Sequence, residues 1–268
     1  MKRLFTLMFF AVLLAMPAAA HATKICVVFA APANSNGVAD VASAENSLRN
    51  LEICQVLQAP AMKAKLTDAK LDPAAVKDLA GATAIGDALH AEYVFWLEGW
   101  NEAKDVFAAM LVDRKSGAKR RATANLREKD DVLREQLVKG AVVALAEGKD
   151  LCPPTANWKD PKVRKSANWG EWTGLKKMPD RSASSVLVKL DERGKVAKAW
   201  LLETSLTPYG ERAMVEVPRY DFAPAKRDDA PALSYGIVET YMKRTGQEDI
   251  DFPGTNRVWG QIFLEEIK

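Results

Sequence analysis

The sequence predicts an α+β protein with two folded parts: an N-terminal mixed β-sheet with packed helices, followed by a small ββαβ unit. Two observations predict this class. Up to about residue 148, short β-branched runs alternate with segments of helical periodicity, which is typical of a sheet covered by helices. From residue 182 onward, a hairpin, a short helix and a further strand follow each other.

The N-terminal part, residues 23–150, contains five predicted strands and three helical regions. The strands are expected at 24–30, 54–57, 92–99, 106–112 and 118–126, with a hairpin turn at 114–117. Helices are expected between residues 38 and 51, from Asp72-Pro73 to about residue 90 as one or two helices, and from Leu133 to Leu145 with Gly148 just beyond the end.

The C-terminal part, residues 182–268, begins with strands at 186–190 and 196–202 around a turn at Asp191–Gly194. A helix from Thr207 is ended by Pro218, and Leu233, Tyr235 and Ile237 alternate along the next strand. This order is small for a separate core, so we expect the apolar tail from Phe252 to Leu264 to add one more element.

The first 22 residues predict an export signal. Lys2 and Arg3 precede an apolar run from Leu4 to Met16, and Ala20-His21-Ala22 fits a small-x-small cleavage site. The run is shorter than the roughly 20 residues that span a bilayer. The periplasm is therefore the expected location, with no integral membrane segment after cleavage. An uncleaved N-terminal anchor remains the alternative.

Composition gives ordinary globular proportions and little electrostatic character. Charged residues make up 27% of the 268 and hydrophobic ones 48%, which argues against extended disorder. Removing Lys2 and Arg3 from 38 basic residues leaves 36 against 35 acidic ones, a net charge of +1. General nucleic-acid binding needs a concentrated positive field, so it is not expected.

Three cysteines, Cys26, Cys54 and Cys152, would enter an oxidising compartment, where one disulfide is plausible. The sequence leaves all three pairings open. We favour Cys54–Cys152, because both residues stand at predicted element ends. Three free or buried thiols are the alternative.

Residues 151–181 form a predicted linker, which Cys152-Pro153-Pro154 separates from the preceding helix. Basic residues lie close together in it, with tryptophans interleaved: Lys159, Lys162, Arg164 and Lys165, with Trp158, Trp169 and Trp172. One interpretation is a basic, aromatic surface for an anionic or carbohydrate ligand. The favoured one is a linker whose tryptophans fold onto one of the two folded parts.

Two motifs in the N-terminal part give a family resemblance. Ile85–Val94 precedes a strand, and Leu111–Gly117 forms the following hairpin. Residues 24–148 thereby resemble the N-terminal domain of TolB and the related CsgG-like group, although His90 stands where that pattern usually has glycine. The resemblance implies a fold used for partner contact in the cell envelope, and it implies no chemistry.

A second resemblance covers about residues 182–244. The hairpin glycine is Gly194, Glu203-Thr204-Ser205 ends a strand, and Tyr220-Asp221-Phe222 leads into Pro224–Pro231. This order resembles the C-terminal domain of TonB-family energy transducers, with Asp229 where glycine is common. The resemblance implies contact with envelope partners through the edge of a strand. The prolines are scattered, so the long proline-rich arm of that family is absent from this sequence.

The sequence contains no motif for catalysis or for a cofactor. His90 is the sole histidine after residue 22, and neither a nucleophile motif nor a phosphate-binding glycine loop accompanies it. Its simplest interpretation is a helix-end residue before a strand. We expect no metal site, no cofactor and no enzymatic activity. An acidic pair for acid–base work or a calcium site is the alternative for Asp228-Asp229 with Glu248-Asp249 and Asp251, but the favoured interpretation is a solvated turn and tail.

These observations predict a non-catalytic periplasmic binding or adaptor protein. Its partner would be an envelope protein or a peptidoglycan-associated ligand, bound by pairing along a strand edge. The predicted partner-binding residues are Leu233, Tyr235 and Ile237 of one strand, with Lys226 and Arg227 before it. The alternative function is a TonB-like component of energised outer-membrane transport.

Overall fold

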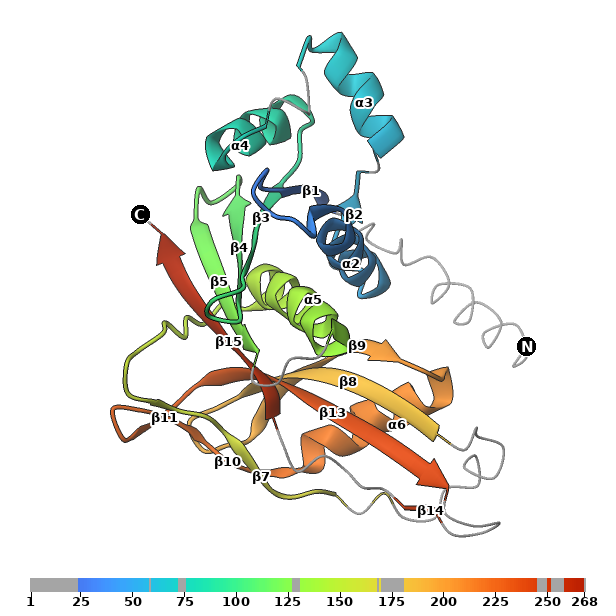
Figure 1. Ribbon diagram of the computed structural model, residues 1–268, viewed down its shortest axis with the longest axis vertical. Helices are drawn as coiled ribbons and strands as arrows, with labels where there is room; N and C mark the ends of the chain where they lie inside the picture. The colour runs from blue at the N-terminus through green and yellow to red at the C-terminus, as the bar shows by residue number, and fades with distance from the viewer. Residues whose placement is uncertain are drawn as a thin grey trace, which may run out of the picture.

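The computed structural model describes residues 24–57, 59–71, 76–126, 131–167, 169, 181–244, 250–251 and 258–267. These residues form an α+β structure with one large mixed sheet, two small sheets and five α-helices (Figure 1). The predicted signal peptide and Trp172 lie outside the described residues. None of the described helices is long and apolar enough to cross a bilayer.

The large sheet begins with a parallel section. Strand β1 (Ile25–Ala30) lies between β2 (Gln55–Val56) and β3 (Tyr93–Asn101) and is parallel to both. Antiparallel strands β4 (Val106–Asp113) and β5 (Lys119–Leu126) continue it. The predicted strands of this part are confirmed, because their β-branched and aromatic residues alternate between two buried faces.

Helices cover both faces of this section. Helix α2 (Gly37–Asn50) and helix α5 (Asp131–Glu147) pack with Cys26, Val28 and Phe95 on one face. Helices α3 (Ala59–Asp68) and α4 (Leu79–Ala88) pack with Val27 and Val94 on the other. Successive residues of β1 point to opposite faces of the sheet. Val27 therefore packs with α3 and α4, whereas Val28 packs with α2 and α5.

The remaining strands of the large sheet come from the C-terminal part. Strand β8 (Arg181–Leu190) lies between β13 (Ser234–Arg244) and β9 (Val196–Thr204), and the short β14 (Ile250–Asp251) also pairs with β13. Helix α6 (Thr207–Glu216) and the 3₁₀ turn Val217–Arg219 cover one face of these strands.

The C-terminal strand β15 (Val258–Ile267) joins the two parts (Figure 1). It pairs with β13 on one side and with β5 on the other, where eight residue pairs run from Gly260 to Ile267. The prediction that the tail adds an element is confirmed, and the same strand also closes the edge of β5. The predicted domains therefore share one sheet, and α5 contacts strands of both.

The disulfide joins Cys26 of β1 to Cys54, which stands just before β2. The favoured pairing of Cys54 with Cys152 is therefore wrong. Parallel pairing of Cys26 with Val56 brings β1 and the start of β2 together, so that the two cysteines are neighbours. Cys152 is a free, fully buried thiol that pairs by backbone hydrogen bonds with Leu264 of β15.

Candidate binding surface

The predicted partner-binding strand is an interior strand of the large sheet. From Tyr235 to Val238, β13 is paired with β8 on one side and with β15 on the other. Tyr235 and Ile237 are fully buried and belong to the core against α5, and Leu233 packs at the margin of that core. These residues therefore offer no free strand edge, because the chain's own C-terminal strand occupies it.

The outer edge of the large sheet on this side is β9, which has two features that oppose strand addition. Its pairing with β8 shifts register at two places, and the charged side chain of Lys198 lies along it. Bulges and lysines are devices that proteins use to protect sheet edges. Recognition by strand addition at β9 is thus not favoured by the geometry.

The predicted linker contributes residues 151–167 and Trp169, which we call the strap. Its strand β6 (Trp158–Lys159) pairs with β11 (Ala225–Arg227), and its strand β7 (Lys162–Lys165) pairs with β10 (Asp221–Ala223). Strand β12 (Ala230–Ala232) completes the hairpin with β11. The structure thereby brings together the basic stretch of the linker and the polar turn that follows Phe222.

Two tryptophans anchor the strap. For Trp158 and Trp169, the prediction that the linker tryptophans fold onto the rest of the protein is confirmed. The Trp158 ring packs edge-on against Phe263 of β15, with ring centroids 5.1 Å apart. The Trp169 ring stacks on Tyr209 of α6 at 5.3 Å. Their apolar faces are therefore used inside the protein.

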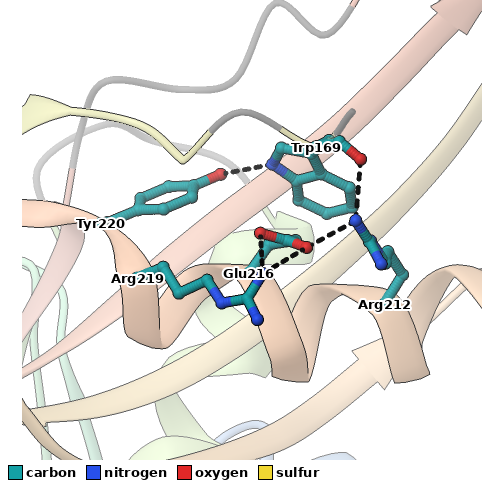
Figure 2. Close-up of polar contacts among 5 residues, drawn as sticks. All are labelled: Trp169, Arg212, Glu216, Arg219 and Tyr220. Carbon is teal, nitrogen blue, oxygen red and sulfur yellow. Dashed lines mark hydrogen bonds and ion pairs between the residues drawn. The ribbon is translucent and has the colours of Figure 1, made fainter. Parts of the chain in front are cut away.

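A buried polar cluster fixes the end of the strap against α6 (Figure 2). The Trp169 indole N–H donates to the Tyr220 hydroxyl at 3.2 Å, and the Arg212 guanidinium donates to the Trp169 carbonyl at 2.8 Å. The fully buried Glu216 carboxylate forms ion pairs with Arg212 at 2.6 Å and with Arg219 at 3.3 Å. A buried carboxylate must be neutralised by positive charges, and the two arginines provide them. We therefore interpret this cluster as structural: it holds the end of the strap against α6.

The exposed side chains of these small sheets are predominantly basic. We call Lys159, Lys162, Arg164 and Lys165 of the strap, together with Lys226 of β11, the basic surface. Within the described part of the chain, only Lys159 of these five makes an ion pair, with Asp229. Asp221 stands opposite Lys165 in the pairing of β10 with β7.

Lys159 and Lys226 stand directly opposite each other on paired strands. Like charges at such positions destabilise a sheet, so this pair is not explained by folding stability. Asp229 compensates it in part. The hydrogen bond from Lys159 lowers the pKa of Asp229 below its ordinary value, with smaller contributions from the charges of Lys159 and Lys226. The local electrostatics thus favour a carboxylate beside these two lysines.

The predicted residues Lys226 and Arg227 have different surroundings. Lys226 is exposed and belongs to the basic surface. Arg227 is half-buried and lies against Cys152. Burial raises the pKa of the Cys152 thiol to about 11, although Arg227 partly opposes this shift. Cys152 therefore remains a protonated thiol at neutral pH, which makes it a poor nucleophile.

The described residues contain no cluster of histidine, cysteine or acidic side chains suited to a metal ion. His90 is exposed and follows α4, where its φ of 55° and the hydrogen bond from Ala91 N–H to the Gly86 carbonyl close the helix. It is a helix-end residue, as its sequence context indicates.

An open hollow at the carboxyl end of β1 has a lining of small apolar and uncharged polar residues from Ala30 to Ala42.

Sequence reasoning found the basic residues of the strap and, separately, Lys226, but not that they lie together. The pairing of Lys159 with Lys226 joins positions 67 residues apart in the chain, and no local pattern reports such a register. One feature of the sequence singled out Asp229: it stands where glycine is common in the TonB-type pattern. Its contact with Lys159 needed the tertiary structure.

Comparisons with protein-family models, with curated proteins and with solved structures give no match to this chain. The resemblances to the TolB N-terminal domain and to the TonB C-terminal domain therefore remain predictions from sequence.

Proposed function

We propose that this protein is a non-catalytic binding or adaptor protein of the periplasm, which recognises an acidic segment of an envelope protein at the basic surface. The observation that carries the proposal is the exposure of three basic side chains within the four residues of β7, Lys162, Arg164 and Lys165. Clustered cations of this kind steer and orient anionic partners.

Two further observations support the class of partner and the compartment. A carbohydrate ligand would be expected to stack on exposed aromatic rings, but Trp158 and Trp169 are used in internal packing. An acidic protein segment needs only the charges. The Cys26–Cys54 disulfide is typical of a protein that folds in an oxidising compartment.

The test is capture of partners from envelope extracts by the wild-type protein and by a Lys162→Ser/Arg164→Ser/Lys165→Ser variant. A matched control, Lys63→Ser/Lys65→Ser/Lys77→Ser, removes three exposed positive charges that are distant in sequence from β7. We expect the β7 variant alone to lose the captured proteins, and wild-type capture to weaken as salt increases. Identical captured proteins for all three forms would contradict the proposal.

Co-sedimentation with purified peptidoglycan separates the second class of ligand. We expect little of the protein to sediment with it, and no difference between the wild type and the β7 variant. Sedimentation that the β7 substitutions abolish would instead assign the basic surface to the anionic groups of the cell wall.

A further inference from the structure

The hairpin between β11 and β12 turns through two acidic residues, Asp228 and Asp229. Both have positive φ angles, 49° and 65°. Tight hairpins of two residues require such angles, and they favour asparagine, aspartate or glycine at the first position and glycine at the second. The backbone of this turn therefore accounts for Asp228 but not for Asp229, whose position is one that favours glycine, and the charge of Asp229 needs another explanation.

Asp229 lies within the basic surface. Its carboxylate accepts a hydrogen bond from Lys159, and that lysine faces Lys226 across the pairing of β6 with β11. The side chains of Lys159 and Asp229 are 67% and 77% exposed. An ion pair this exposed shifts an equilibrium by no more than about five-fold, so an incoming carboxylate can replace it.

We propose that Asp229 is a built-in competitor, which occupies Lys159 until a carboxylate of the acidic partner replaces it. The inference rests on the proposed function and adds how the site is regulated. A carboxylate beside the two opposed lysines relieves their repulsion. In the free protein Asp229 supplies it, and in the complex the partner does. The competitor lowers by the same factor the affinity of every segment that uses Lys159, so a segment stays bound only if its other carboxylates contact the rest of the basic surface.

Binding of a fluorescent hexaglutamate peptide at low ionic strength tests this exchange in the full mature chain. Asp229→Asn removes the competing carboxylate, and Asp228→Asn is the matched reference. Both variants lose one negative charge from the same turn, and asparagine tolerates positive φ at either position. We expect Asp229→Asn to bind the peptide about two- to five-fold more tightly than Asp228→Asn.

A third variant shows whether the gain passes through the contact with Lys159. In a Lys159→Gln background, Asp229→Asn should no longer strengthen binding relative to Asp228→Asn, because the contact that it releases is already gone. A gain that persists in this background would overturn the inference, since it would arise from general electrostatics.

The outcomes separate this inference from the proposed function. Equal or weaker binding by Asp229→Asn than by Asp228→Asn overturns the competitor. If the Lys162→Ser/Arg164→Ser/Lys165→Ser variant still loses the peptide in that case, the proposed binding surface stands. Failure of the wild type and of both aspartate variants to bind the peptide at any salt concentration overturns the acidic-partner proposal and the competitor together.

Discussion

Single residues at the ends of helices carry backbone strain in this protein. His90 follows α4 with a φ of 55°, and Glu52 and Lys70 follow α2 and α3 with φ values of 52° and 55°. In each case the next residue donates its N–H back to the last turn of the helix. This end geometry favours glycine, because a side chain in the left-handed region is strained.

Replacement of His90 by glycine should therefore stabilise the fold. We expect His90→Gly to raise the free energy of unfolding by about 1 kcal/mol, measured by urea titration, because it relieves the left-handed strain. His90→Ala is the control, since alanine keeps the strain, and it should give no gain. A loss of stability in His90→Gly would show that the imidazole makes a contact of its own.

The disulfide is the second residue-scale feature, and it links positions 28 residues apart. We expect the Cys26→Ala/Cys54→Ala variant to lose about 3 kcal/mol of stability, because the cross-link restricts the unfolded chain.

Peptide mapping under non-reducing conditions checks the pairing itself. It should recover Cys26 linked to Cys54 and Cys152 as a free thiol; a Cys54–Cys152 peptide would contradict the structure.

At the element scale, a charged contact attaches α5 to the edge strand β9. Lys139 of α5 is 7% exposed and pairs with Glu203 of β9 and, at 2.8 Å, with Glu135. Burial disfavours the ionised form of Glu203, but the hydrogen bonds from Lys139 and Gln136 outweigh it and lower the pKa of the carboxyl. Burial likewise opposes the charge of Lys139, whose pKa is nevertheless raised by Glu135 and Glu203.

The pH dependence of stability should report this contact. Because the pKa of Glu203 is lower in the folded state, its contribution is present above the ordinary value of 4.5 and is lost as pH falls through the folded value. We expect Glu203→Gln to cost about 1 kcal/mol at pH 7, with this difference from wild type shrinking in acid. Glu211→Gln, which removes an exposed carboxylate of α6, is the control, and a pH-independent cost of Glu203→Gln would contradict the expectation.

At the scale of the whole molecule, β15 makes the two halves one structure. It pairs with β5 and with β13, and α5 packs on strands from both halves. One hydrophobic cluster accordingly contains Phe95 of β3, Leu187 of β8 and Ile262 of β15. A shared sheet and a shared core favour cooperative unfolding of the whole.

A substitution confined to the C-terminal half tests this cooperativity. A Cβ atom at Gly210 of α6 would lie 2.8 Å from the Thr204 side chain, so Gly210→Ala should cost about 1–3 kcal/mol by overpacking. Native-state hydrogen exchange should show the same loss for the slowest amides of β3 as for those of β8. Unchanged exchange in β3 would show that the halves unfold separately.

The sequence by itself determined the elements of the protein and their turns. A short β-branched run predicts β1, alternating residues predict β4 and β8, and Gly117 and Gly194 at positive φ end the turns where they were expected. The basic character of the strap was also visible, because charge is a property of residue type. These features depend on residues a few positions apart, and the chain reports such relationships directly.

Only the tertiary structure decided which segments meet. It paired Cys26 with Cys54, inserted β15 between β5 and β13, and thereby enclosed the strand that was expected to bind a partner. It also placed Asp229 beside Lys159. Each of these outcomes depends on pairing between strands that are distant in the chain. Such pairing is selected by burial and register over the whole sheet, and no local spacing encodes it.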